Sequence, residues 1–191
     1  MRKLIYYISA TLDGFIAGPE GQYDFLPFDG EEAEAILTDF PETMPTPARA
    51  PFGVADRAAQ RFDTVIMGRA TYDPGLKAGL TSPYAHLTQY VVSRTLVSPD
   101  PAVTVVDDPV PLVRELKEQD SGLDIWLCGG GKLAAVLRDE IDELIIKRHP
   151  IFLGSGIPLF DGPFTPTRFA PVGTRSFNSG FSLTHFAKVQ S

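Results

Sequence analysis

Short apolar runs alternate with segments of helical periodicity along most of this chain. The runs are rich in aliphatic and aromatic residues, as in strands covered on both faces, and lie at residues 4–9, 63–68, 89–93, 103–108 and 124–129. Helices are predicted at residues 31–40 and 54–62, after Pro109 and after Gly131. Strands that alternate with helices favour a mostly parallel sheet. We therefore expect an α/β fold with three αβα layers.

The C-terminal part departs from this alternation. Residues 143–153 predict one long strand with a bulge or an edge position at Pro150, because proline donates no ladder hydrogen bond. The tail predicts two strands joined by a turn at residues 178–180, which makes the sheet mixed, with a C-terminal antiparallel hairpin. Residues 41–53 are proline-rich and aperiodic, so we expect a structureless loop of the kind that serves as a lid or binding loop.

Composition narrows the protein class. The chain has 191 residues and shows no internal boundary, so a single domain over 1–191 is expected. Its net charge of −7 disfavours binding to nucleic acid, which depends on a basic face. The single cysteine, Cys128, rules out an internal disulfide and a multi-cysteine zinc site, and fits a reducing compartment. No metal site is expected.

The N-terminus offers two interpretations. Its short apolar run resembles a signal peptide, but Asp13 interrupts the run and no small-residue cleavage site follows. No stretch approaches the roughly 20 apolar residues that span a membrane. We expect a buried first strand, a cytoplasmic address and no membrane partner.

The strongest local motif is LCGGGKLAAVL, where a buried strand meets Gly129, Gly130 and Gly131 and then a helix. Free backbone N–H groups at a helix start, beside residues without side chains, suit a phosphate or pyrophosphate. The alternative is a closely packed strand-to-helix turn. A Rossmann fingerprint is disfavoured because basic residues stand where its acidic residue belongs. A P-loop is excluded because Leu133 follows Lys132.

Two more strand ends carry groups suited to phosphate. Gly68 is followed by Arg69 and Thr71, and another strand ends at Ser93 and Arg94. Ligands of open α/β sheets bind at the carboxyl ends of the strands, so one dinucleotide would explain all three positions. Each residue taken alone is better explained as a solvated cap.

Together these motifs resemble the dihydrofolate reductase fold family, and in particular the reductase domain of riboflavin biosynthesis and its stand-alone relatives. The resemblance covers residues 3–187 and rests on five segments, at residues 9–17, 65–72, 91–94, 128–133 and 150–160. It implies a dihydrofolate reductase-like fold and NADPH as the cofactor. By matching positions, Arg69 and Thr71 after Gly68 would hold phosphates, while Ser93 and Arg94 would reach the adenosine 2′-phosphate.

The same resemblance assigns the remaining cofactor contacts. The segment Gly129–Lys132 would pass under the pyrophosphate, with a cis peptide between Gly129 and Gly130. The backbone of Ser9 and Ile16 would anchor the nicotinamide carboxamide.

A proton donor is expected among the acids of the first loop and the helix after it: Asp13, Asp24, Asp29, Glu31 and Glu32. The segment 26–29 resembles the L-P-x-D of dihydrofolate reductases, which favours Asp29 as the catalytic acid. Capping of the helix at 31 is an equal alternative for Asp29. Asp13 either binds substrate or caps its own turn.

The cluster 147–149 is basic, and strand alternation places Lys147 and His149 on one face and Arg148 on the other. Lys147 is therefore a candidate substrate contact, with surface charge as the alternative.

These residues predict an NADPH-dependent reductase of a small nitrogen heterocycle, in the manner of 5-amino-6-(5-phosphoribosylamino)uracil reductase. A non-catalytic nucleotide-binding module is the alternative. A dihydrofolate reductase is less favoured, because the glutamates after Asp29 would repel a folate tail. A homodimer is also expected. The resemblance implies pairing through sheet edges, and the C-terminal strands are rich in aromatic residues: Phe169, Phe177, Phe181 and Phe186.

Overall fold

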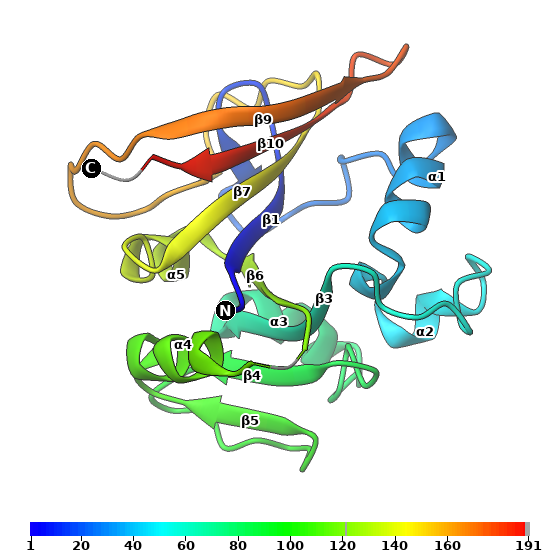
Figure 1. Ribbon diagram of the computed structural model, residues 1–191. Helices are drawn as coiled ribbons and strands as arrows, with labels where there is room; N and C mark the ends of the chain where they lie inside the picture. The colour runs from blue at the N-terminus through cyan, green and yellow to red at the C-terminus, as the bar shows by residue number, and fades with distance from the viewer. Residues whose placement is uncertain (121, 190–191) are drawn as a thin grey trace.

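A twisted eight-stranded sheet forms the centre of the computed structural model, which describes residues 1–120 and 122–189 (Figure 1). The strands lie in the order β5-β4-β3-β6-β1-β7-β10-β9. The six strands from β5 to β7 are parallel: β5 (Val103–Val106), β4 (Thr88–Val92), β3 (Phe62–Gly68), β6 (Asp124–Gly129), β1 (Leu4–Ala10) and β7 (Ile141–Arg148). The antiparallel hairpin of β9 (Phe169–Ser176) and β10 (Ser182–Lys188) joins the sheet beside β7.

Helices cover both faces of this sheet. On one face, α4 (Pro109–Glu118) and α5 (Gly131–Val136) pack over Leu4 and Tyr6 of β1. On the other face, Ile5 and Tyr7 meet α3 (Arg69–Lys77) and Phe40 at the end of α1 (Gly30–Asp39). Figure 1 shows α4 and α5 on the side away from α1 and α2 (Thr46–Arg49). The expected three-layer αβα fold with a mixed, mostly parallel sheet is confirmed.

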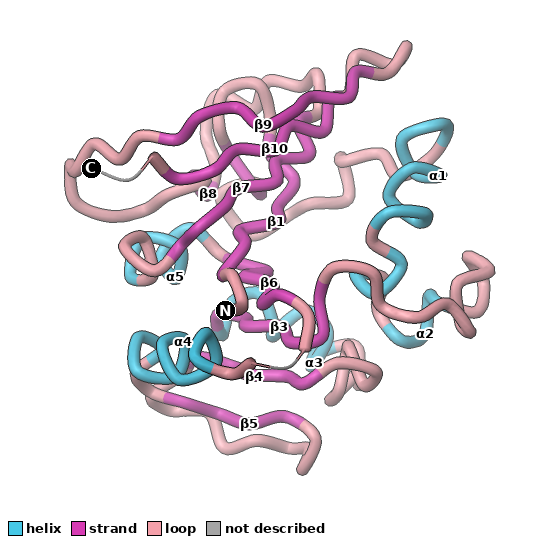
Figure 2. Tube along the Cα trace, viewed as in Figure 1, coloured by secondary structure: helices cyan, strands magenta, loops and turns pink. Residues whose placement is uncertain are grey.

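A second, two-stranded sheet is made of β2 (Phe15–Ala17) and β8 (Ile157–Pro158). The chain around β8 is almost entirely loop (Figure 2). Its backbone is held to the first loop, because the N–H of Leu159 donates to the oxygen of Gly14. This small sheet therefore closes the carboxyl edge of the main sheet beside β1.

The helix predicted at 54–62 is absent, and this prediction was wrong. The backbone N–H groups of Gln60, Arg61 and Phe62 all donate to the carboxylate of Glu42, at 3.1, 2.8 and 2.8 Å. Groups that a helix would have bonded internally are bonded instead to a buried acid distant in sequence. Residues before Phe62 therefore form turns and bends.

The segment 41–53 is also more ordered than expected. It contains a 3₁₀ turn, η1 (Pro41–Thr43), followed by α2. The buried Arg49 guanidinium donates to the carbonyl oxygens of Pro41, Ala55 and Arg57. These bonds fasten the segment to its surroundings, so the expectation of a structureless loop was wrong.

The strand predicted at 143–153 is shorter and begins earlier, as β7 at 141–148. Proline ends the ladder, because Pro150 has no N–H to donate. The N–H of His149 still donates to Ala10, at 2.9 Å, and Leu12 donates to Ile151. The predicted turn at 178–180 is confirmed, and it joins β9 to β10.

No helix in the described ranges is long and apolar enough to cross a membrane. Within the same ranges, no cluster of three or more His, Cys, Asp or Glu side chains could hold a metal ion.

Candidate active site

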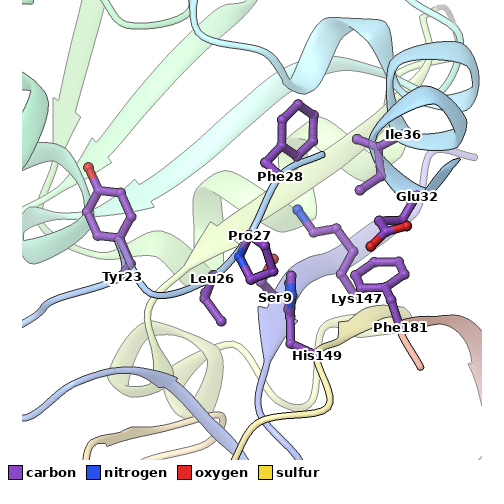
Figure 3. Close-up of a pocket in the computed structure, with 10 residues that line it drawn as sticks. All are labelled: Ser9, Tyr23, Leu26, Pro27, Phe28, Glu32, Ile36, Lys147, His149 and Phe181. Carbon is purple, nitrogen blue, oxygen red and sulfur yellow. The ribbon is translucent and has the colours of Figure 1, made fainter. Parts of the chain in front are cut away.

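A cavity of about 160 Å³ lies at the carboxyl ends of β1 and β7, beneath α1 (Figure 3). Apolar side chains form most of its wall, and four of its lining residues are titratable. Its lining residues are Ser9, Tyr23, Leu26, Pro27, Phe28, Glu32, Ile36, Lys147, His149 and Phe181. Carboxyl strand ends are where ligands bind in open α/β sheets, so this cavity is the candidate substrate site.

Lys147 is the cation of this cavity. Its Nζ lies 4.1 Å from the centre of the Tyr7 ring, which belongs to the neighbouring strand β1. It forms no ion pair with any residue that the structure describes. Burial lowers the pKa of Lys147 to about 8. The cavity therefore holds an ammonium group that loses its proton more readily than an ordinary lysine.

His149 lies two residues further on the same face, with 4% of its surface exposed. Its ring meets Phe181 edge-on, with the ring centres 4.9 Å apart. Burial, and then the charge of Lys147, lower the pKa of His149 to about 4. The imidazole is therefore neutral near pH 7 and contributes a hydrogen-bonding group rather than a charge.

Glu32 brings a carboxylate to the opposite wall. It lies one helical turn before Ile36 on α1, and both side chains point toward Lys147 (Figure 3). Only 8% of Glu32 is exposed, and no described side chain forms an ion pair or hydrogen bond with its carboxylate. The first turn of a helix favours a negative charge. The cavity thus presents one cation and one anion that do not satisfy each other.

The structure brings only some of the predicted substrate-side residues to this cavity. Ser9 and Lys147 line it, and Arg148 is exposed, as strand alternation predicts. Asp29 is exposed at the N-cap of α1, makes no side-chain cap hydrogen bond and is absent from the cavity lining. Its catalytic role stays a prediction.

Asp13 holds two loops together. Its carboxylate accepts from the Thr11 hydroxyl at 2.6 Å and from the N–H groups of Leu153 and Gly154. The hydrogen bond from Thr11, with those from the backbone, lowers the pKa of Asp13. This geometry matches the turn-capping alternative, and its substrate contact stays a prediction.

The glycine turn lies against the ends of β3 and β2. A Cβ on Gly68 would come within 3.3 Å of the Gly129 carbonyl oxygen. A Cβ on Gly130 would lie 3.8 Å from Thr71 Oγ1 and 3.5 Å from Ile16 Cδ1. Gly129 has a φ of +126°, and its peptide bond to Gly130 is cis, as the resemblance implied. Residues predicted separately at the ends of β3 and β6 are therefore neighbours, with Ile16 of β2 beside them.

Gly131 is needed because the Pro158 backbone comes close to it. A Cβ at this position would overlap the carbonyl oxygen of Pro158, and the Gly131 carbonyl accepts from the N–H of Asp161 at 3.1 Å. The space that a side chain at Gly131 would need is thus filled by the chain itself. A side chain atom at Gly130 would meet Thr71 only at an ordinary van der Waals distance.

The cationic side chains near these strand ends differ in whether they are already paired with an acid. Arg69 is paired with Asp73 one helical turn away, whereas Arg94 and Lys132 are exposed. Ser93 Oγ accepts from the N–H groups of Thr95 and Leu96, at 3.3 and 3.0 Å. Its own hydroxyl proton remains available to an acceptor. Because β4, β3 and β6 are adjacent, these groups form one row that fits an anionic dinucleotide.

The sequence matches the family described as the RibD C-terminal domain over residues 2–183. The chain belongs to this family. Two uncharacterized proteins of Bacillus subtilis (strain 168) are similar over almost their whole lengths. YwjB is 33% identical over 192 residues, covering 98% of this chain and 99% of YwjB. YyaP is 30% identical over 193 residues, covering 94% and 91%.

Solved structures agree with the family. A putative riboflavin biosynthesis protein from Shewanella sp. PV-4 matches over 100% of both chains, with 25% identity and a TM-score of 0.70. RibD of Acinetobacter baumannii matches 99% of this chain and 58% of its own, with 15% identity and a TM-score of 0.63. A diaminohydroxyphosphoribosylaminopyrimidine deaminase/5-amino-6-(5-phosphoribosylamino)uracil reductase of Thermotoga maritima matches 98% and 57%, with 15% identity and a TM-score of 0.65.

The last two matches show the fold, and this chain spans a little over half of each of those proteins. The expected dihydrofolate reductase-like fold is confirmed.

Sequence reasoning did not single out Glu32 or Tyr7. Glu32 stood among five candidate acids, and the helical spacing of Glu32 and Ile36 was the available signal for its orientation. Tyr7 appeared only as a strand residue, although its ring lies beneath the cavity's cation.

Proposed function

We propose that this RibD C-terminal domain is an NADPH-dependent reductase that transfers a hydride to a small nitrogen heterocycle of the ribosylaminopyrimidine type. The observation that carries the proposal is the continuity between the glycine turn and the cavity. Ile16 packs beside Gly130, and Ser9 lines the cavity. β1, which carries Ser9, lies between β6 and β7, so a dinucleotide with phosphates at the glycine turn would have its nicotinamide at the cavity mouth.

NADPH would supply the hydride when bound. The chain's own residues would hold it: the backbone of Gly129–Lys132 would face the pyrophosphate, and Arg69 with Thr71, at the start of α3, would support a neighbouring phosphate. Ser93 and Arg94 would bind the 2′-phosphate, because an arginine fork binds phosphate through two charge-assisted hydrogen bonds.

The cavity limits what enters beside the cofactor. Its volume of about 160 Å³ is below the roughly 300 Å³ at which drug-sized pockets begin, so it takes a ring rather than a whole nucleotide. The apolar walls from Phe28, Ile36 and Phe181 suit the faces of a flat heterocycle. The phosphate end of the substrate would extend toward solvent.

Folate is disfavoured by charge. Glu31, Glu34 and Asp39 line the hollow between α1 and β9, where Arg175 is already paired with Asp39 at 2.8 Å. An anionic glutamate tail passing this side of α1 would meet several carboxylates and few free cations.

NADPH oxidation tests the proposal. The acceptors are 5-amino-6-(5-phosphoribosylamino)uracil, its dephosphorylated form, a dihydropterin and a flavin. NADPH binding is followed separately by quenching of Trp126, the single tryptophan, on the strand that leads into the glycine turn. Turnover of a pyrimidine supports the proposal. Tight NADPH binding without turnover of any acceptor would establish the nucleotide-binding module instead.

A further inference from the structure

Lys147 and Glu32 face the same small cavity without pairing with each other (Figure 3). We propose that Lys147 is the proton donor of the reductase, delivering its proton to the nitrogen of the C=N bond whose carbon accepts the hydride. Glu32 orients the substrate ring by accepting hydrogen bonds from its N–H groups. The proposal rests on the proposed function and adds the acid that this function requires.

Strand register places Lys147 beside the expected hydride. In the parallel pairing of β1 with β7, Lys147 is the partner of Ser9, whose backbone is the predicted anchor of the nicotinamide carboxamide. Both residues lie near the carboxyl ends of their strands and both line the cavity. A ring held between them has one face toward the nicotinamide and one edge toward Nζ.

The surroundings of Lys147 favour easy release of its proton. Tyr7 of β1 offers the face of its ring, and burial raises its pKa above the usual value, so the phenol stays neutral. Burial raises the pKa of the Cys128 thiol of β6 to about 12, and His149 is neutral. Glu32 of α1 is the charged group of the opposite wall.

Strand β10 adds no competing partner near the ammonium. Its residue beside Lys147 is Leu183. Two residues along the same face, His185 is bonded to the carboxylate of Glu143 at 2.7 Å. Burial is therefore the main influence on Lys147, and it lowers the pKa to about 8. General acids work best when their pKa lies near the operating pH.

The step balances without any further reactant. In 5-amino-6-(5-phosphoribosylamino)uracil this bond is the C1′=N imine that forms when the ribosylamine ring opens. Lys147 gives the proton of one Nζ–H bond to the imine nitrogen, while C1′ receives the hydride of bound NADPH. The substrate gains two electrons and two hydrogens, and the cofactor leaves as NADP⁺. The neutral amine of Lys147 then takes a proton from water at the open side of the cavity.

Lys147→Arg separates proton donation from charge. Arginine keeps the cation but holds its proton at any working pH. We expect NADPH affinity by Trp126 quenching and KM for 5-amino-6-(5-phosphoribosylamino)uracil to change about threefold or less, because the charge remains. We expect kcat to fall about a hundredfold or more, the usual contribution of a general acid. Arg148→Gln, one residue away on the exposed face, is the matched control and should retain kcat.

The pH dependence of kcat tests the same role of Lys147 in the wild-type protein. Since only the ammonium form donates, wild-type kcat should fall as pH rises through about 8, and this limb should be missing from Lys147→Arg. Full kcat in Lys147→Arg, or a flat wild-type profile from pH 7 to 9.5, overturns the proposal. So does loss of kcat in Asp29→Asn with retention in Lys147→Arg, which would return the role to Asp29. Absence of turnover with every acceptor defeats the proposed function itself.

Discussion

The buried carboxylate of Glu42 accepts a 2.8 Å hydrogen bond from the backbone N–H of Phe62, the first residue of β3. The same carboxylate accepts from the two preceding N–H groups, so one side chain takes the place of a turn of secondary structure before the strand. This arrangement fixes where β3 begins, and β3 leads to Gly68 and Arg69, which belong to the proposed cofactor site.

Glu42→Ala should therefore be strongly destabilising. It leaves three backbone donors without their acceptor, and an unsatisfied buried donor costs about 1–3 kcal/mol, so a loss on the order of 3 kcal/mol is expected. Urea unfolding measures it. Glu31→Ala removes an exposed glutamate of α1 and should stay within about 0.5 kcal/mol of the wild type. Equal midpoints for the two variants would contradict the assignment.

Local sequence was sufficient for the strands and insufficient for this segment. Continuous apolar runs such as 4–9 and 124–129 predicted buried parallel strands because both faces of those strands are covered. Residues 54–62 have helical composition, but Glu42 and Arg49 bind their backbone from elsewhere in the chain. Tertiary hydrogen bonds of this kind leave no local pattern.

Some residues of the candidate site could likewise be predicted from local sequence, and others could not. The motifs around Gly68 and Gly129 are contiguous in sequence, and their positions at neighbouring strand ends followed from the parallel sheet. The orientation of α1 did not, because the packing of Ala33 and Ile36 turns Glu32 inward and leaves Asp29 exposed. The low pKa of Lys147 depends on burial by several distant segments, which alternation along β7 could not predict.

Gly131→Ala should weaken NADPH binding and lower the stability of the fold. The new methyl group would overlap the Pro158 carbonyl oxygen, which is backbone and cannot simply rotate away. Overpacking of this kind costs about 1–3 kcal/mol and should displace the glycine turn, so NADPH affinity falls together with stability. Gly75→Ala, in α3, meets only ordinary contacts and is the control. Trp126 quenching and thermal unfolding report the two effects, and unchanged values for Gly131→Ala would refute the close approach.

Arg94→Ala should weaken the binding of NADPH and leave the binding of NADH nearly unchanged. NADPH differs from NADH by the 2′-phosphate, and a hydrogen bond to a charged group contributes about 1.5–3 kcal/mol. Because each 1.4 kcal/mol is tenfold, NADPH affinity should fall about tenfold or more while NADH affinity stays nearly constant. Arg69→Ala should weaken both, since Arg69 stands at the start of α3, where the proposal puts phosphates common to both cofactors. Equal losses for the two cofactors in Arg94→Ala would place the 2′-phosphate at another strand end.

A homodimer is expected through the free edge of β9. This strand pairs with β10 on one side, and Val172 is 60% exposed. The predicted aromatic contacts are partly used within the chain, because Phe181 is buried and Phe169 and Phe186 pack on the core. Light scattering should give twice the mass of the chain, and Val172→Lys should reduce it to one chain. A single-chain mass for the wild type at micromolar concentration rules the dimer out.

Lys147→Met should make the fold more stable near neutral pH while removing activity. The pKa of Lys147 is about 8 in the folded chain against 10.5 in the unfolded one, so the unfolded state binds the proton more tightly. The wild type bears this cost in full below pH 8. The cost fades as pH rises from 8 to 10.5, where both states become neutral. At pH 7 a gain of about 3 kcal/mol is expected for the variant, the free energy that corresponds to a fall in pKa from 10.5 to about 8. The measurement is the difference in unfolding free energy between Lys147→Met and wild type from pH 7 to 10.5. His149 titrates below this range, and Cys128 titrates in both proteins, so its contribution largely cancels. A difference that stays constant with pH would show that Lys147 is not held as a costly buried cation.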